Sequence, residues 1–301
     1  LLRELGIAAW PVLVASGWRD GIQRLMPSTA CFNHVIVGFE LDGQRYFADP
    51  TVVGQGGDLE RLAAPPFGAG LQIDPATDAL LELPPPALAE LTLTETFTLD
   101  RKCRDGAVDQ VLEASGWLAD DIRAAILNQG QRQFAKQRAD ALQQNFPALL
   151  PNPESMQIGD DSDGNRIELR SRHSLPTWGQ AGRKPPDFFS YGAHGLFLAV
   201  ETIDPHQQRA QPFLLRHPLR VCHSVVVRGK AVKKQQAGAF THEGPGFRYR
   251  VDVRSRRREV RFDYRWETTA AEIAAEQWPE YCQQRAAALE RAGALVHTPP
   301  F

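Results

Sequence analysis

Alternating hydrophobic and polar positions are the most common pattern in this chain, and they predict mostly β-strands. Residues 91–99 alternate almost strictly, as in a strand with one buried face, and residues 247–253 and 260–266 alternate in the same way. Further strands are expected at 165–175, 196–203 and 213–227, a count that indicates an antiparallel β-sandwich. If 247–253 and 260–266 pair as a hairpin, their apolar side chains share one face.

Helical spacing of apolar residues interrupts the strands in one place and follows them in another. A stripe of apolar residues predicts a helical insertion near 120–146, with Asp120 or Asp121 as its N-cap and Gly130 weakening it in the middle. A second helix is expected to close the chain within 270–296.

A cluster of three prolines at residues 84–86 is the predicted domain boundary. The expected fold class is α+β. We expect an antiparallel core over residues 1–85, a β-rich, sandwich-like domain over 88–268 that contains the helical insertion, and the closing C-terminal helix.

The first region contains a strong hairpin signal. Residues 32–41 and 44–49 are rich in β-forming side chains, and the dipeptide Asp42-Gly43 separates them. The segment 7–15 reads as another strand, and its Pro11 favours an edge position over a central one.

The hairpin places a histidine beside an aspartate. In a two-residue loop Leu41 faces Gln44, so His34 lies opposite Thr51, and His34 and Asp49 become diagonal neighbours on one face. A diagonal pair of this kind is close enough for a hydrogen bond between imidazole and carboxylate. The other face is apolar, and we predict that it is the core side. That face carries Val35, Val37, Phe39, Leu41, Tyr46 and Ala48.

A histidine oriented by an aspartate is the base of a nucleophilic triad, which also needs a nucleophile. Cys31 is near in sequence, but alternation along an extended strand points it away from His34, so we expect it to be structural. The other cysteines, Cys103, Cys222 and Cys282, have no metal-binding or disulfide spacing and are expected to be small buried residues.

Three segments resemble successive motifs of the bacterial transglutaminase-like superfamily, which has papain-like chemistry. They are residues 2–7 (LRELGI), 32–37 (FNHVIV) and 46–51 (YFADPT). The resemblance is specific over residues 1 to about 75 and weaker beyond. Carried over by position, it implies that His34 is the catalytic base and that Asp49 is its orienting residue.

The resemblance also implies a truncated papain-like core and a nucleophilic cysteine on a helix before Leu1. The intact protein is then expected to be a thiol acyltransferase or cysteine peptidase/amidase acting on a peptide or protein, whereas this chain alone is inactive. The alternative is a non-catalytic module of the same fold that binds peptide or glycan. Bacterial relatives with such tails are often exported, which favours a periplasmic or extracellular location.

The composition and the net charge limit the classes of binding partner that we expect. The formal net charge is −2, so no overall field favours nucleic acid or an anionic membrane. The arginines around 248–265 alternate with acidic residues and predict a solvated face rather than a nucleic-acid site. No segment is long and apolar enough to span a membrane. The glycines of 54–57 are loop residues, and we expect neither a cofactor nor a metal ion.

Overall fold

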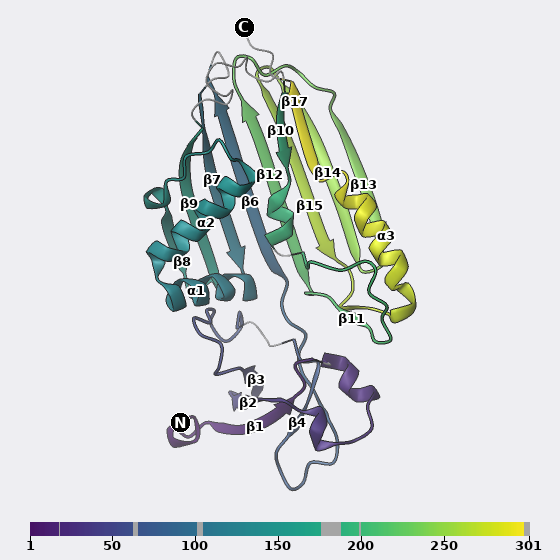
Figure 1. Cartoon of the computed structure of the whole chain (residues 1–301). Coiled ribbons are helices and arrows are strands. Elements are labelled where there is room, and N and C mark those ends of the chain that lie inside the picture. Colours follow the sequence, from purple (N-terminus) through teal and green to yellow (C-terminus); the bar gives the residue numbers. More distant parts are fainter. Residues whose placement is uncertain (18, 63–65, 101–104, 176–187, 199, 298–301) are drawn as a thin grey trace.

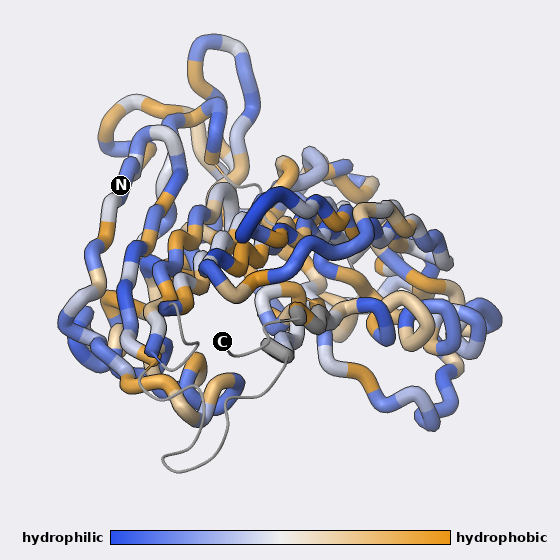
Figure 2. Tube along the Cα trace, turned by 90° about the horizontal axis from the view of Figure 1, so that it is seen from above, coloured by the Kyte–Doolittle hydropathy of each residue, from blue (hydrophilic) through white to orange (hydrophobic). Residues whose placement is uncertain are grey.

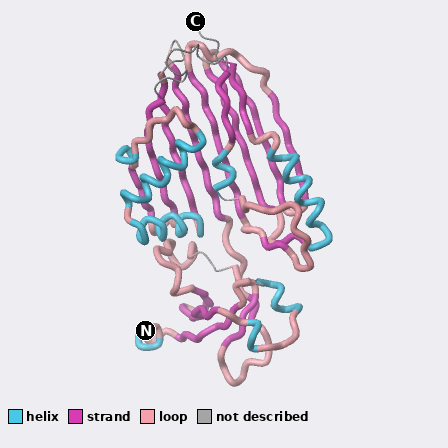
Figure 3. The backbone as a smooth tube through the Cα atoms, in the orientation of Figure 1, coloured by secondary structure: helices cyan, strands magenta, loops and turns pink. Residues whose placement is uncertain are grey.

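The computed structural model describes residues 1–301 except 18, 63–65, 101–104, 176–187, 199 and 298–301. The described chain forms a five-stranded sheet, followed by an eight-stranded sheet with helices on one face (Figures 1 and 3). Both are mainly antiparallel, so the mixed α+β class predicted from sequence is confirmed.

The first sheet has the strand order β3-β2-β1-β4-β5. Its strands are β1 (Ala8–Val14), β2 (His34–Leu41), β3 (Gln44–Ala48), β4 (Ala69–Gln72) and β5 (Leu81–Glu82). Short 3₁₀ helices connect or precede them: η1 (Arg3–Leu5), η2 (Arg19–Arg24) and η3 (Thr29–Cys31).

The edge position predicted for the strand that contains Pro11 is wrong, because β1 lies in the centre of the sheet. The proline is accommodated since the ladder between β1 and β4 covers only Val12–Val14. Pro11 therefore lies beyond the paired stretch, where its missing N–H removes no ladder hydrogen bond to β4, and its carbonyl accepts one from the amide of Ile73 at 3.0 Å.

The predicted register of the β2–β3 hairpin is confirmed over its paired length. Leu41 pairs with Gln44, and the ladder continues to Val37 and Ala48. Asp42 and Gly43 have positive φ angles of 53° and 78°, as a type I′ turn requires.

The core side of this hairpin differs from the predicted one: Phe39 on the predicted core face is buried, but the main apolar cluster lies on the face of His34. Ile36 and Phe47, which share a face with His34, are buried, whereas Val35 on the predicted core face is 45% exposed. Phe67 and Leu83 pack on the His34 side and complete its apolar cluster. Both faces carry apolar residues, so alternation fixed the pairs but not which side is covered.

The second sheet has the order β13-β14-β15-β12-β6-β7-β9-β8, and β6 and β12 are its parallel pair. Its strands are β6 (Ala89–Leu99), β7 (Gly106–Ser115), β8 (Gln157–Asp161), β9 (Arg166–Leu175), β12 (Leu219–Arg228), β13 (Gly238–Gly244), β14 (Phe247–Arg256) and β15 (Glu259–Thr268). In the β14–β15 hairpin Tyr249 pairs with Trp266 and Val251 with Tyr264, so the predicted shared apolar face is confirmed.

These strands form one sheet and not a sandwich. Helices and a two-stranded ribbon cover its inner face (Figure 1). Alternation shows that one face is buried but does not show whether a second sheet or helices bury it. The covering elements are α1 (Trp117–Gln129), α2 (Gln131–Asn145), α3 (Trp278–Leu289), and the ribbon of β10 (Phe188–Gly192) with β17 (Gly293–His297).

The helical insertion differs from the prediction in two ways. It is two helices, because Gly130 adopts φ 83° between them. It begins at Trp117, so neither Asp120 nor Asp121 is its N-cap. The closing helix expected within 270–296 is present as α3, and strand β17 follows it.

Further short elements complete the described chain. They are η4 (Pro153–Ser155), η5 (His194–Leu198), η6 (Ala275–Gln277), and the pair β11 (Phe213–Leu214) and β16 (Glu272–Ile273). The strand predicted at 196–203 is therefore wrong, since this region begins as the 3₁₀ helix η5.

The glycine loop at 54–57 contacts the part of the chain that contains the large sheet, at α1 and at the turn between β8 and β9. Gly56 donates its N–H to Oδ1 of Asp120 at 2.9 Å, and Gly57 donates to the carbonyl of Ser162 at 2.6 Å. A Cβ at Gly56 would lie 2.5 Å from a nitrogen of Arg123, so a larger residue would displace this guanidinium. Asp120, predicted as a cap, instead holds this loop and the buried Arg123.

The outer face of the large sheet is polar, and several of its arginines are paired. Ion pairs of 2.5–2.7 Å join Arg248 to Glu243, Arg250 to Asp252, Arg261 to Asp263, and Arg265 to Glu267. Figure 2 shows hydrophobic and hydrophilic residues interspersed along the chain. Within the described residues, no helix has the length and apolar character needed to cross a membrane.

Candidate active site

His34 stands at the first position of β2, where the local sequence holds the backbone firmly. Ser28 caps the preceding turn η3 by accepting a hydrogen bond from the amide of Ala30 at 3.2 Å. Asn33 then ties the strand to the end of β1, because its Oδ1 accepts the N–H of Ser16 at 2.9 Å. The pairing of His34 with Val14 places the imidazole at one end of the sheet.

Asp49 directly follows β3 and is fixed by a local turn. Its Oδ1 accepts hydrogen bonds from the backbone N–H of Thr51 at 3.0 Å and from the Thr51 hydroxyl at 2.7 Å. This arrangement is typical of an aspartate in a turn. It leaves the second carboxylate oxygen, Oδ2, to point at His34.

The two side chains meet as the hairpin predicted. Nε2 of His34 lies 2.7 Å from Oδ2 of Asp49. The aspartate side chain is 8% exposed and the histidine 26%, so the carboxylate is covered while the ring remains open to solvent. The ring of Phe67 lies at 5.7 Å from the imidazole and forms one wall of the site.

The charge state of Asp49 assigns the protons of the pair. Burial raises the pKa of this carboxyl, but the hydrogen bonds from Thr51 and His34 outweigh it, so the pKa is lowered overall. An ionised carboxylate only accepts hydrogen bonds, so Nε2 of His34 carries the proton. The neutral ring then has its lone pair on Nδ1, to which no described residue donates a hydrogen bond.

The described cysteines do not complete a triad. Cys31 lies in η3 rather than on the strand, so the alternation argument does not apply to it. Its sulfur points to the carbonyl of Met26 at 3.7 Å, and the side chain packs with Ala15 and Ile22. Cys222 is partly buried and Cys282 is buried, and Cys103 lies outside the described residues.

The predicted geometry of His34 and Asp49 is thus present, whereas their catalytic roles remain predictions. The side chains share a face and are hydrogen-bonded, although the ladder ends at Val37 and Ala48, one pair before Asp49. Turn geometry and register were sufficient to find this pair.

A second cluster of titratable side chains was not found from sequence. Glu95 and His223 are completely buried, and Tyr191 is 4% exposed. Nε2 of His223 lies 3.0 Å from Oε2 of Glu95, and the Tyr191 hydroxyl donates to the same oxygen. Nε2 of His194 lies 3.5 Å from Oε1, so this cluster gathers four residues from β6, β10, η5 and β12.

Electrostatics in this cluster follow from burial and mutual contact. Burial raises the pKa of Glu95, but His194, His223 and Tyr191 together lower it to about 2. Burial lowers the pKa of His194. The signal in the sequence was Glu95 itself, since it occupies an inward position between Leu93 and Phe97 in an otherwise apolar series.

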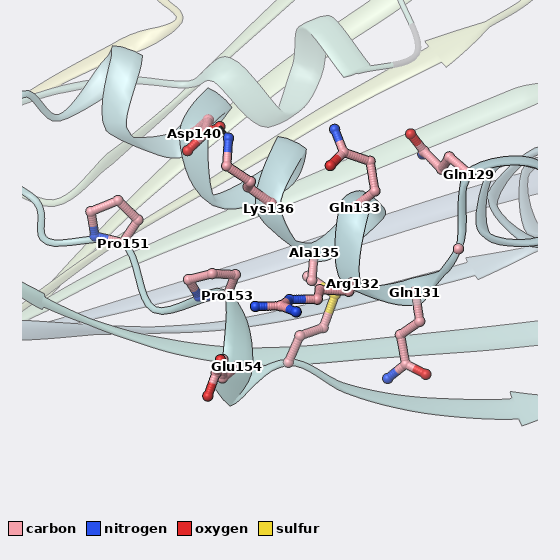
Figure 4. Close-up of a pocket in the computed structure, with 12 residues that line it drawn as sticks. Gln129, Gln131, Arg132, Gln133, Ala135, Lys136, Asp140, Pro151, Pro153 and Glu154 are labelled. Carbon is pink, nitrogen blue, oxygen red and sulfur yellow. Dashed lines mark hydrogen bonds and ion pairs between the residues drawn. The ribbon is translucent and has the colours of Figure 1, made fainter.

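Other features of the described chain offer less chemistry. A hollow of about 1180 Å³ lies between α2 and the segment 151–156 (Figure 4), and its lining contains an ion pair between Lys136 and Asp140 at 3.0 Å. No His, Cys, Ser, Thr or Tyr lines it. Among the described residues no group of three or more His, Cys, Asp or Glu side chains could hold a metal ion.

Comparisons with known proteins give one weak structural likeness. No family model matches the chain, and no curated protein matches it. A crystal structure titled as a "putative protease" from Parabacteroides distasonis matches with a TM-score of 0.47 and 10% identity, over 98% of this chain and 41% of that one. The chain thus spans less than half of that protein. At this level of similarity the likeness shows no family.

Proposed function

We propose that His34 and Asp49 are the base and its orienting carboxylate in a thiol acyltransferase or cysteine peptidase of the transglutaminase-like type. One observation carries the proposal: Nε2 of His34 is held by Asp49 at 2.7 Å, while Nδ1 has no donor among the described residues and the ring is partly open. A histidine held through one nitrogen presents the other at a fixed place, as a general base requires.

The chemistry follows from this arrangement. Nδ1 of His34 accepts the proton of a cysteine thiol, and the thiolate attacks the carbonyl carbon of an amide. The tetrahedral intermediate collapses to a thioester when the C–N bond breaks, and His34 returns the proton to the leaving amine. Water or a second amine then attacks the thioester and releases the thiol. Asp49 keeps the ring oriented and stabilises the imidazolium that forms transiently.

The thiol is supplied by a residue outside these 301 positions. The resemblance of residues 2–7 to the end of the nucleophile helix motivates this part of the proposal. The contacts of Cys31 with Ala15 and Ile22 also argue against that residue as the nucleophile.

The natural protein, including the residues before Leu1, provides the test. It should incorporate a fluorescent amine into casein or hydrolyse peptide amides, whereas residues 1–301 alone should do neither. His34→Ala should lower turnover by about 10²–10⁴-fold, and Asp49→Asn by a similar factor. The matched control is His206→Ala, a change at an exposed histidine elsewhere. Turnover by the 301-residue chain alone would overturn the proposal.

The same experiment separates the enzyme from a binding module. The non-catalytic alternative replaces the proposal if the natural protein has no cysteine before Leu1 and no turnover, but binds an immobilised peptide or glycan. By resemblance we also propose a periplasmic or extracellular location, which fractionation against a periplasmic marker enzyme tests.

A further inference from the structure

A pocket lies on the inner face of the large sheet, beneath α1, α2 and η5, and it ends at the Glu95 cluster. Its volume is about 520 Å³, a size that suits a small molecule. Apolar walls come from Leu93, Phe134 and Leu142, and its rim includes Phe197, which is 52% exposed. An exposed phenylalanine at the mouth of a pocket is apolar surface that a ligand can cover.

Arg138 lines this pocket, and its charged guanidinium has no hydrogen-bonding partner among the described residues. Its guanidinium carbon lies 5.9 Å from the ring centre of Phe134, which lines the same wall. Burial lowers the pKa of Arg138, but an arginine remains charged at neutral pH. Arg138 is partly exposed, so water or a ligand can reach its N–H donors.

Glu95 does not use these donors, because other residues satisfy its two oxygens. Oε1 accepts a hydrogen bond from Nε2 of Gln110 at 2.5 Å, and Oε2 is shared by Tyr191 and His223. Glu95 therefore balances the charge of Arg138 at a distance, and the planar donor face of the guanidinium stays available. That face matches the two oxygens of a carboxylate.

We propose that this pocket binds a small ligand in which a single carboxylate is attached to an apolar body. The carboxylate pairs with Arg138, and the body lies against Leu93, Phe134 and Leu142 beneath Phe197. A single charge fits, since among the described lining residues Arg138 is the guanidinium without a hydrogen-bonding partner, and a dianion would approach the ionised Glu95.

Binding of decanoate below its micelle concentration, measured by calorimetry on the 301-residue chain, tests the proposal. Decanol is the uncharged comparison. Decanoate should bind at least about tenfold more tightly than decanol, because the charged pair contributes roughly 1.5–3 kcal/mol. Arg138→Met should remove this preference. The matched control Arg132→Met changes an exposed arginine on the same helix and should keep it.

A second variant and a second pair of ligands complete the experiment. If Arg138→Met does not fold, as judged by circular dichroism, Arg138→Lys replaces it and should reduce the preference severalfold, since lysine lacks the planar donor pair. Acetyl-Leu-Leu with a free or an amidated C-terminus distinguishes a peptide end from a free acid as the source of the carboxylate. The proposal is overturned if both acids bind no better than their uncharged partners, or if the Arg138 variant retains the preference.

Discussion

Among the described residues, histidines contact carboxylates at two sites, one around Asp49 and one around Glu95, and the two sites differ in what surrounds them. In the small sheet, Asp49 holds Nε2 of His34, while Nδ1 has no hydrogen-bond donor among the described residues and the ring is partly exposed. In the large sheet, Glu95 and His223 are completely buried, and both carboxylate oxygens are occupied by several partners. A histidine–carboxylate contact is therefore not enough to indicate a catalytic base. A free ring nitrogen that a substrate can reach is also needed.

The comparison predicts losses of stability of different size when the two carboxylates are removed. Glu95→Ala should lower the free energy of unfolding by about 3–5 kcal/mol, because it leaves buried partners without their charge. Asp49→Ala should cost only about 1–2 kcal/mol, because the site is partly open. Urea denaturation followed by circular dichroism measures both. The matched control for Glu95 is Thr96→Ala on the outer face of the same strand, where a change within about 0.5 kcal/mol is expected. Equal losses for Glu95 and Asp49 would remove the distinction.

The second prediction concerns the stability of the fold at low pH. Burial lowers the pKa of His173 and His194 below 6.5, so their contribution to stability is present above that pH and is lost as pH falls through their lowered pKa values. Glu95 has a pKa lowered from 4.5 to about 2, so its contribution is present above 4.5 and is lost as pH falls toward 2. The pKa of Asp49 is also lowered, and its smaller contribution is lost below 3.8.

Unfolding midpoints in urea, measured from pH 7 to pH 3, should therefore fall in two stages. His194→Gln should flatten the upper stage, whereas His206→Gln, at an exposed position, should change neither. A midpoint that stays constant between pH 7 and pH 5 would contradict this account of the buried cluster.

A smaller effect is expected from Gly195, which presses its backbone against the buried cluster. A Cβ at this position would lie 2.6 Å from Nδ1 of His223 and 2.8 Å from a methyl of Leu93. Gly195→Ala should therefore cost about 1–3 kcal/mol. Gly238→Ala is the control, because nothing lies within 4 Å of a Cβ there. Thermal melts of both variants give the comparison, and a harmless Gly195→Ala would show that the packing is looser than described.

The smallest effect should come from Cys31. In the natural protein, Cys31→Ser should change turnover by no more than a few-fold, since the sulfur packs among Ala15 and Ile22. Complete loss of activity in a variant that melts like the parent would make Cys31 the nucleophile and overturn the assignment.

How far the sequence could predict this structure depends on the range of the interactions. The hairpin at Asp42-Gly43 and the pair His34–Asp49 follow from a local turn and strict alternation, and both were predicted. The covered side of that hairpin depends on Phe67 and Leu83, which come from distant segments. The alternation likewise predicts a sandwich where the structure has a single large sheet, because the same alternation occurs in both.

The Glu95 cluster shows a different limit. Its members are spread from residue 95 to residue 223, and the parallel pairing of β6 with β12 brings Glu95 and His223 together, while Tyr191 and His194 come from β10 and η5. No local pattern encodes that pairing. The inward-facing charge at Glu95 was the only sign in the sequence, and an isolated charge in a strand does not name its partners.

The most direct test of the contrast between the His34–Asp49 site and the Glu95 cluster is a nitrogen-15 spectrum of the histidine rings in the 301-residue chain near neutral pH. For His34, the ring proton should reside on Nε2 and be protected from exchange, while Nδ1 shows the shift of an unprotonated nitrogen. His34→Gln assigns these signals. Asp49→Ala should expose the Nε2 proton to rapid exchange and leave the His223 signals unchanged. A proton on Nδ1 of His34, or signals that do not respond to Asp49→Ala, would contradict the claim that Asp49 orients this base.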